Sequence, residues 1–367
     1  MKRALIAGSV AGLFAAALPL SSAMAQTSVT LYGIADAAVG ASDRGDAPGA
    51  NYGATGNVFS GVQSASRFGI RGSEDLGGGL KALFVAEGGW NVDEGTGANA
   101  SGGLDFARRS VVGLGGSFGS VMLGRDYTPA YYAGVVTDVF SYGMFGNAYA
   151  FQQSGGYTLR ASNAIHYVSP NFGGLTIRAM GGSGERNVEP RSQGNIYGLS
   201  AVYQANRITA SAYFQELRQA TVPASDGYDR NKQYGIGGGY DFGPARLVAG
   251  WGRSELSADS TNFDFYNVGA GVRIGAGELM GSFTQLKAEA GRNGLLGGTA
   301  GAEGRAKVYG VAYTYPLSKR TNVYASFGTT RNDSNGAFGV FSSGTSVAAA
   351  GVGAKPKAVA LGIRHMF

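Results

Sequence analysis

Two arginines four residues apart are the first candidates for functional chemistry in this sequence. Arg67 and Arg71 alternate with Phe68 and Ile70, so in a β-strand the two arginines share one face and the apolar pair shares the other. An arginine on the lipid-facing side of a strand costs about 2–4 kcal/mol at the bilayer midplane. In a membrane, these two side chains must therefore face an aqueous interior, where their guanidinium groups attract anions without any covalent step.

Other chemistries have little support in the sequence. The chain has no Cys and only two His, His166 and His365, which excludes disulfide frameworks, thiol nucleophiles and Cys/His zinc sites. Scattered Ser, His and Asp residues form no recognisable triad. Glycine-rich strings such as residues 235–239 lack the G-x-x-x-x-G-K-S/T phosphate-binding pattern. We expect no catalytic residue, no cofactor and no metal.

The composition favours a large β-structure that positions these arginines. The 367 residues include 64 Gly, 20 Tyr and 19 Phe, and only 15% are charged, against about 25% in a typical soluble protein. Glycine is unfavourable inside helices, whereas aromatic residues favour strands. The formal net charge of +6 is not gathered into a patch, so nucleic-acid binding is not expected.

The N-terminal segment has the pattern of an export signal. Met1–Arg3 is cationic, residues 4–20 are uncharged and largely apolar, and Ala23-Met24-Ala25 precedes Gln26 as a cleavage site. A transmembrane helix is the alternative, although the run is short for one. Cleavage of residues 1–25 would leave 342 residues with a formal charge of +4. No second stretch of about twenty apolar residues follows, so helices cannot hold the remaining chain in a membrane.

From Thr27 to the C-terminus, strands of alternating character are separated in turn by short turns and long polar connections. Short turns are expected at 76–79, 117–120, 171–174, 205–206, 243–244, 276–277 and 317–321. Long connections are expected near 41–60, 93–103, 126–160, 185–193, 219–230, 289–304 and 332–354. This order is typical of an up-and-down meander whose two ends face different environments. We predict a single all-β domain over residues 26–367, a transmembrane antiparallel β-barrel of sixteen strands.

A soluble β-sandwich would show the same alternation with its apolar face turned inward. The polar face favours the barrel, because it is poor in Lys and Glu and rich in Gly, Ser and Arg. The chain also ends on Phe367 within a strand. Aromatic residues lie near strand ends, as in an interfacial girdle: Tyr32, Trp90, Tyr167, Tyr203, Phe242, Trp251 and Tyr315.

Four segments and the C-terminal residue resemble the Gram-negative general porins, particularly the neisserial and burkholderial type. The segments are SRFGIRGSEDLGGGLKA at 66–82, RRSVVGL at 108–114, GSVMLGR at 119–125 and NAIHYVSPNFGGL at 163–175. The resemblance implies a trimer of sixteen-stranded barrels in which the third loop folds inward and narrows each pore. It also implies that Phe367 is a signal to the outer-membrane assembly machinery. His365 departs from the pattern, since an aromatic residue is common there.

The resemblance also suggests which residues line the narrow part of the pore. Arg108, Arg125 and Arg160 match luminal basic positions of the family and join Arg67 and Arg71. Arg108 and Arg109 are adjacent and must point oppositely on a strand, so Arg109 is left for a rim or a subunit interface. Asp138 matches an acidic position on the inward loop that opposes the arginines. Asp126, at the start of the long connection, is the second acid assigned to the constriction, with a simple pair to its neighbour Arg125 as the alternative.

The connection from residue 126 to 160 is expected to be functional, because loops of this length without their own structure are usually either functional or disordered. Its aromatic residues are expected to pack against the inner wall, with a trimer or surface contact as the alternative: Tyr127, Tyr131, Tyr132, Phe140, Tyr142, Phe145, Tyr149 and Phe151. With few acids opposite the arginines, the constriction is expected to be net positive and to prefer anions.

The sequence therefore predicts an outer-membrane porin that lets small hydrophilic solutes and ions diffuse passively. Expected partners are two further copies of the chain, outer-membrane lipid and lipopolysaccharide, and the assembly machinery. A barrel enzyme such as a phospholipase and an adhesin with an occluded lumen are the alternatives. Arg44-Gly45-Asp46 spells an adhesion tripeptide, but three-residue matches are common by chance.

Overall fold

The computed structural model describes residues 27–47, 53–99, 102–148, 158–184, 194–220, 228–256, 261–290 and 298–367. The predicted signal segment at 1–25 lies outside these ranges, as do Tyr149 and Phe151 of the long third connection. Within the described ranges, no helix is both long enough and apolar enough to cross a membrane.

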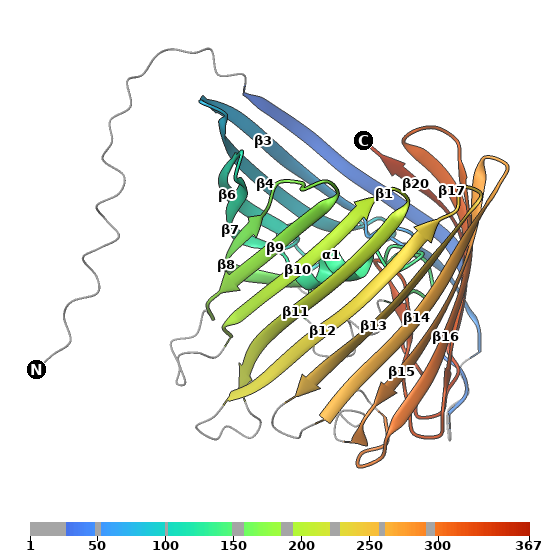
Figure 1. The fold of residues 1–367 in the computed structure, drawn as a ribbon. Helices are drawn as coiled ribbons and strands as arrows, with labels where there is room; N and C mark the ends of the chain where they lie inside the picture. The colour runs from blue at the N-terminus through green and yellow to red at the C-terminus, as the bar shows by residue number, and fades with distance from the viewer. Residues whose placement is uncertain are drawn as a thin grey trace, which may run out of the picture.

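Sixteen strands of the described chain form one closed antiparallel wall (Figure 1). The first strand pairs with the last over Ile34–Met366 to Asp43–Lys357, which closes the barrel and confirms the predicted fold. The wall strands are β1 (Ser28–Asp43), β3 (Arg67–Gly77), β4 (Leu80–Asn91), β6 (Arg109–Gly116), β7 (Gly119–Tyr127), β8 (Arg160–Val168), β9 (Leu175–Gly182), β10 (Ile196–Ala205), β11 (Ile208–Ala220), β12 (Tyr228–Asp241), β13 (Ala245–Leu256), β14 (Thr261–Ile274), β15 (Gly277–Ala288), β16 (Gly304–Pro316), β17 (Thr321–Asn332) and β20 (Lys357–Met366).

The short turns all lie at one end of the barrel, which is the upper end in Figure 1. The turn between β3 and β4 requires glycine, because Gly77, Gly78 and Gly79 have φ values of 85°, 61° and 80°. The long connections leave from the opposite end. The predicted alternation of short turns and long connections is therefore observed in the described chain.

The wall has an apolar outer face. Val39, Val112 and Leu361 are 61%, 59% and 62% exposed, whereas Asp36 and Ala38, which lie on the other face of β1 from Val39, are 0% and 3% exposed. An exposed aliphatic belt around a closed sheet fits a lipid-facing barrel and not a soluble sandwich. Tyr32 is an exception to the predicted aromatic girdle: it faces inward, since its hydroxyl donates to Glu87 at 2.9 Å.

The strand beside β1 is interrupted, so that two strands, β2 (Thr55–Ser60) and β3, lie end to end along one edge of β1. β2 pairs with the second half of β1, from Ala37 to Ser42, and β3 pairs with its first half. Residues 61–66 interrupt the line between β2 and β3. The buried Asp36 on β1 stabilises this interruption, because its carboxylate accepts hydrogen bonds from the Ser64 N–H at 2.7 Å and the Tyr324 hydroxyl at 2.5 Å.

Two connections fold into the barrel interior. The inward loop, described at residues 128–148 and 158–159, contains the short helix α1 (Pro129–Val135), which is capped by Thr128 and packs on β10, β11 and β12. The second inward segment, residues 333–356, contains the two-stranded β18 (Val340–Phe341) and β19 (Ser346–Val347). A further short strand, β5 (Thr96–Gly97), pairs with the end of β4.

Candidate functional site: an arginine-lined constriction

The inward loop crosses the barrel and is hydrogen-bonded to its inner wall at three strands, β13, β14 and β17. The Asn267 amide on β14 donates to the Thr137 carbonyl at 2.9 Å, and Arg246 on β13 donates to the Val139 carbonyl at 2.8 Å. Further along, the Phe145 N–H donates to Ser326 Oγ on β17 at 2.9 Å. The loop is thus held against the wall, as predicted for the third connection.

Glycines on the inner face of the wall make room for this loop. A Cβ at Gly269 would lie 2.6 Å from Val139, and one at Gly310 would lie 2.6 Å from the Phe140 ring. A Cβ at Gly328 would lie 2.6 Å from the backbone of Phe145 and Gly146. Real Cβ contacts are essentially never this short, so part of the glycine excess has a steric purpose: it lets the loop approach the sheet closely.

The second inward segment packs on the inward loop. The Gly146 N–H donates to the Phe341 carbonyl at 3.1 Å, and Val340 is fully buried in the same apolar cluster as Phe145. Phe338 stacks on Phe263 of β14 with ring centroids 5.8 Å apart. The two inward connections therefore fill the side of the interior next to β13–β17. The sequence pattern did not predict that residues 333–356 fold inward.

The opposite side of the interior carries the predicted arginines. Arg67 and Arg71 lie on the inner face of β3, because Ile70 between them is 37% exposed on the outer face. Arg71 lies over the ring of Tyr32, with its guanidinium carbon 5.2 Å from the ring centroid. Their predicted shared, inward orientation is observed.

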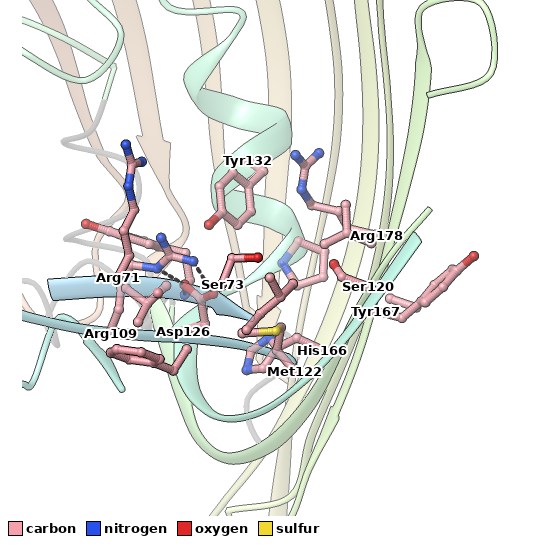
Figure 2. A pocket seen from close by; sticks show the side chains of 18 of the residues that line it. Arg71, Ser73, Arg109, Ser120, Met122, Asp126, Tyr132, His166, Tyr167 and Arg178 are labelled. Atoms are coloured by element: carbon pink, nitrogen blue, oxygen red, sulfur yellow. Dashed lines mark hydrogen bonds and ion pairs between the residues drawn. The ribbon is translucent and has the colours of Figure 1, made fainter. Parts of the chain in front are cut away.

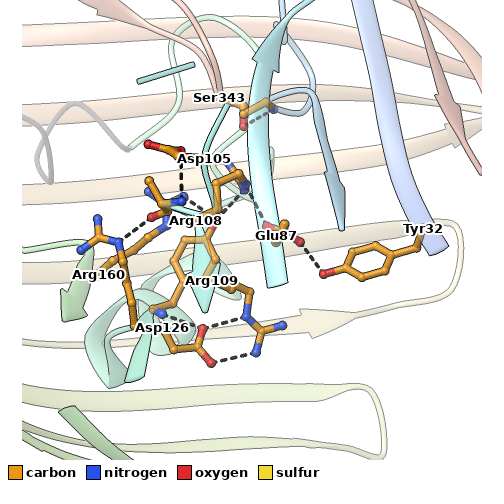
Figure 3. Close-up of polar contacts among 12 residues, drawn as sticks. Tyr32, Glu87, Asp105, Arg108, Arg109, Asp126, Arg160 and Ser343 are labelled. Carbon is orange, nitrogen blue, oxygen red and sulfur yellow. Dashed lines mark hydrogen bonds and ion pairs between the residues drawn. The ribbon is translucent and has the colours of Figure 1, made fainter. Parts of the chain in front are cut away.

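Arg108 and Arg160 converge on one phenol hydroxyl (Figure 3). Arg108 donates to the Tyr127 hydroxyl at 2.5 Å and Arg160 donates to it at 2.6 Å, while Glu87 pairs with Arg108 at 2.8 Å. The Arg160 guanidinium also lies 4.3 Å from the Tyr127 ring centroid. The ring of Tyr131 on α1 stacks on Tyr127 at 4.2 Å. The inward loop therefore fixes both arginines through Tyr127.

The expectation that Arg109 points away from the interior is wrong. Arg109 lies on the same face as the buried Val111, opposite the exposed Val112, and makes a two-bond ion pair with Asp126 at 2.8 and 2.7 Å (Figure 3). β6 begins at Arg109, and Arg108 occupies a bend before the strand. Strict alternation does not apply across that bend, so both arginines reach the interior. Asp126 pairs with Arg109 and not with its neighbour Arg125.

Arg125 joins Arg108 and Arg160 around a cavity of about 230 Å³. It lies at a β-bulge, since the pairing of β7 with β8 skips from Gly124 to Asp126, and bulges redirect side chains. Its guanidinium donates to the Ala107 carbonyl and, at 2.7 Å, to Ser162 Oγ. The structure thus brings together three of the arginines that the resemblance selected.

Asp138 does not oppose the arginines, which corrects the expectation drawn from the resemblance. It is 2% exposed, and its carboxylate accepts hydrogen bonds from the N–H groups of Phe140 at 2.7 Å and Ala148 at 2.6 Å. Burial raises the pKa of Asp138 to about 6, and the backbone hydrogen bonds oppose that shift. Asp138 therefore stabilises the fold of the inward loop rather than facing the water of the lumen.

Two further arginines belong to this group. Arg178 on β9 lies 4.4 Å from the ring centroid of Tyr132 on α1, and Arg364 on β20 is close enough to interact electrostatically with Asp36 and Arg67. Both lie within strands, β9 and β20, but no local sequence feature shows that they lie near the inward loop. The arginine cluster, as named from here on, comprises Arg67, Arg71, Arg108, Arg109, Arg125, Arg160, Arg178 and Arg364.

The described aromatic residues of the connection from 126 to 160 pack inside the barrel, as expected. Tyr127, Phe140, Tyr142 and Phe145 are all less than 9% exposed.

In the part of the chain that the structure covers, no group of three or more His, Cys, Asp or Glu side chains could hold a metal ion.

A closed sixteen-stranded barrel with an apolar outer face and an inward loop defines a transmembrane channel protein. The model of the Gram-negative porin family matches residues 10–335, and the chain belongs to this family. It is 32% identical over 379 residues to Outer membrane porin protein 32 of Delftia acidovorans, with all of both chains covered. It is 30% identical over 420 residues to an outer membrane porin protein of Bordetella pertussis, again over the full length of both.

Among solved structures, the chain is similar to the anion-selective porin from Comamonas acidovorans. The TM-score is 0.78 at 29% identity, covering 93% of this chain and 100% of that one. The resemblance seen in the sequence motifs is confirmed. The protein is an outer-membrane porin of a Gram-negative bacterium, a passive channel for small hydrophilic solutes and ions.

Proposed function

We propose that this porin prefers anions and that the arginine cluster sets the preference. The observation that carries the proposal is the charge around the narrow part of the described interior. Eight arginines meet four carboxylates there: Asp36, Glu87, Asp105 and Asp126.

Two of these carboxylates are neutralised by arginines of the cluster itself, in the pairs Arg108–Glu87 and Arg109–Asp126. Within the described residues, five members of the cluster have no carboxylate within 4.0 Å: Arg67, Arg71, Arg160, Arg178 and Arg364. A narrow aqueous passage between low-dielectric walls focuses the field of such charges. Chloride is therefore concentrated and potassium is repelled.

The solved relative described as anion-selective supports the same conclusion. The test is the reversal potential of purified protein in a planar bilayer under a KCl gradient. We expect it to lie toward the chloride equilibrium potential, and a value toward the potassium equilibrium potential would overturn the proposal.

We also propose a homotrimer. An apolar groove of about 620 Å³ runs over the outer faces of β1, β2, β17 and β20, and its lining includes the small residues Ala37 and Ala325. Small side chains let another barrel wall approach closely. A band of trimer mass on a native gel that collapses after boiling is the expected result, and a monomer before boiling would contradict it.

Three further parts of the proposal concern export and the membrane. Residues 1–25 are removed as a signal peptide, which the N-terminal sequence of the mature protein tests.

Phe367 directs assembly. Its side chain is exposed and its backbone pairs with Gly33, which leaves it accessible at the short-turn end. Lipopolysaccharide phosphates bind Lys307 and Arg331, which lie directly opposite each other on the outer face near the long connections. Loss of copurifying lipid phosphate on replacing both residues would support this contact.

A further inference from the structure

A second cavity, of about 390 Å³, lies in the inner wall between α1 and the short-turn end of the barrel (Figure 2). Residues of β1, β3, β4, β6, β7, β8 and β9 line it, together with Pro129 and Tyr132 of the inward loop. Small-molecule sites typically have volumes of about 300–1,000 Å³. The cavity is therefore large enough for a small organic solute, and three members of the arginine cluster line it: Arg71, Arg109 and Arg178.

Two cations without acidic partners border this cavity. Figure 2 shows Arg71 and Arg178 on opposite sides of Tyr132, with their guanidinium groups pointing the same way. Neither has a carboxylate of the described chain within 4.0 Å. Arg109, which also lines the cavity, is already paired with Asp126. Arg71 and Arg178 are thus the groups available to an incoming anion.

The rest of the lining is mostly carbon. Met122, Leu83, Val85 and Pro129 contribute apolar side chains, and the buried imidazole of His166 lies beside Met122 (Figure 2). These groups add no binding free energy for an inorganic anion, because it has no apolar surface to remove from water. An anion with a flat hydrocarbon body gains binding free energy from both the charge contact and the burial of its apolar surface.

We infer that this cavity is a binding site for small organic monocarboxylates with an apolar body, such as an aromatic acid. The carboxylate binds the guanidinium of Arg71 or Arg178, and the ring lies against Met122 and Val85. Permeating acids of this kind pause there and slow the chloride current. The inference rests on the proposed anion preference, which lets such solutes reach the cavity.

The test compares benzoate with acetate as blockers of the chloride current through the purified porin in planar bilayers. Both are monocarboxylates, and only benzoate has a ring. We expect benzoate to block saturably, at a half-blocking concentration roughly tenfold below that of acetate, because of the added apolar burial. Equal block by the two acids in a channel that still prefers chloride over potassium overturns the cavity assignment and leaves the proposed function standing. Failure of the proposed function is recognised separately, from the reversal potential.

Two variants locate the block. Arg178→Gln should raise the half-blocking concentration of benzoate roughly tenfold, since a charge-assisted hydrogen bond is lost. Met122→Gln has a similar volume and should remove the difference between benzoate and acetate while leaving acetate unchanged. Arg320→Gln, the same chemical change in an exposed turn at the same end of the barrel, is the matched control. Wild-type block in both cavity variants, each verified as assembled by its gel mobility, would refute the site.

Discussion

A single methyl group added to the inner wall should loosen the inward loop. Gly328 on β17 lies directly opposite Gly310 on β16, and both face the interior beneath Phe145 and Gly146. In Gly328→Ala, the new Cβ would lie 2.6 Å from the Gly146 nitrogen and from the Phe145 carbonyl carbon. These are backbone atoms, so no side-chain rotation can relieve the overlap, and the loop itself must move away from the sheet.

The size of the effect follows from that overlap. Ordinary contact begins at 3.4 Å, so the loop must retreat by about 0.8 Å, and overpacking of this kind costs about 1–3 kcal/mol. Since about 1.4 kcal/mol corresponds to a factor of ten in an equilibrium constant, the undocked loop should become roughly ten- to hundredfold more populated. The hydrogen bond from the Phe145 N–H to Ser326 Oγ would also lengthen from its 2.9 Å.

Single-channel recording measures the outcome. We expect Gly328→Ala to show a larger mean conductance with more open-channel noise, because the loop no longer holds the constriction at a fixed width. Gly281→Ala is the matched control: Gly281 lies on the outer face of the nearby strand β15, and its new Cβ would have only the Gly310 carbonyl oxygen nearby, at 4.0 Å. Both changes carry the same gain in backbone entropy. Currents from Gly328→Ala that match those of wild type would refute the steric argument.

Three further predictions concern the charges around the lumen. Arg67→Ala combined with Arg71→Ala should move the KCl reversal potential toward zero while the proposed heat-sensitive trimer persists, and loss of that trimer would show that these arginines are structural. Asp36→Ala leaves the Ser64 N–H and the Tyr324 hydroxyl unpaired, so it should destabilise the barrel by about 1–3 kcal/mol and lower the temperature at which the barrel unfolds on gels, with Asp36→Asn intermediate. Because the pKa of Asp138 is raised from 3.8 to about 6, the docked loop binds a proton that the undocked loop does not between about pH 4 and 6. Docking is therefore stabilised as the pH falls through this range, and open-channel noise should decrease from pH 7 to 5 in wild type but not in Asp138→Asn; an increase would contradict the assignment.

The strands were predictable because their signal is local. Alternation along β3 places Arg67 and Arg71 opposite Ile70, and glycine-containing turns end the strands at positions that the sequence shows directly. The same rule failed at Arg109, because alternation holds only within a strand and the boundary at Arg109 depends on pairing with β4.

The contacts inside the barrel were not predictable from local patterns. Asp138 matches an acidic luminal position by sequence, yet its burial depends on how residues 138–148 fold back on themselves. The glycines opposite Val139 and Phe145 lie more than a hundred residues away in the sequence, so no local window reveals why they lack a side chain. The inward position of residues 333–356 depends on the same long-range packing.

Thiol labelling tests the central claim most directly, namely that solutes pass along the arginine-lined side of the interior. The chain has no native cysteine, so single cysteines can be placed at Ser73, which lines the cavity below α1, and at Thr284, which is fully buried on the inner face of β15. We predict that an anionic methanethiosulfonate reagent lowers the current of Ser73→Cys and reacts there faster than a cationic one, while Thr284→Cys is unaffected. Faster reaction of the cationic reagent at Ser73→Cys, or an equal loss of current in Thr284→Cys, would contradict the account.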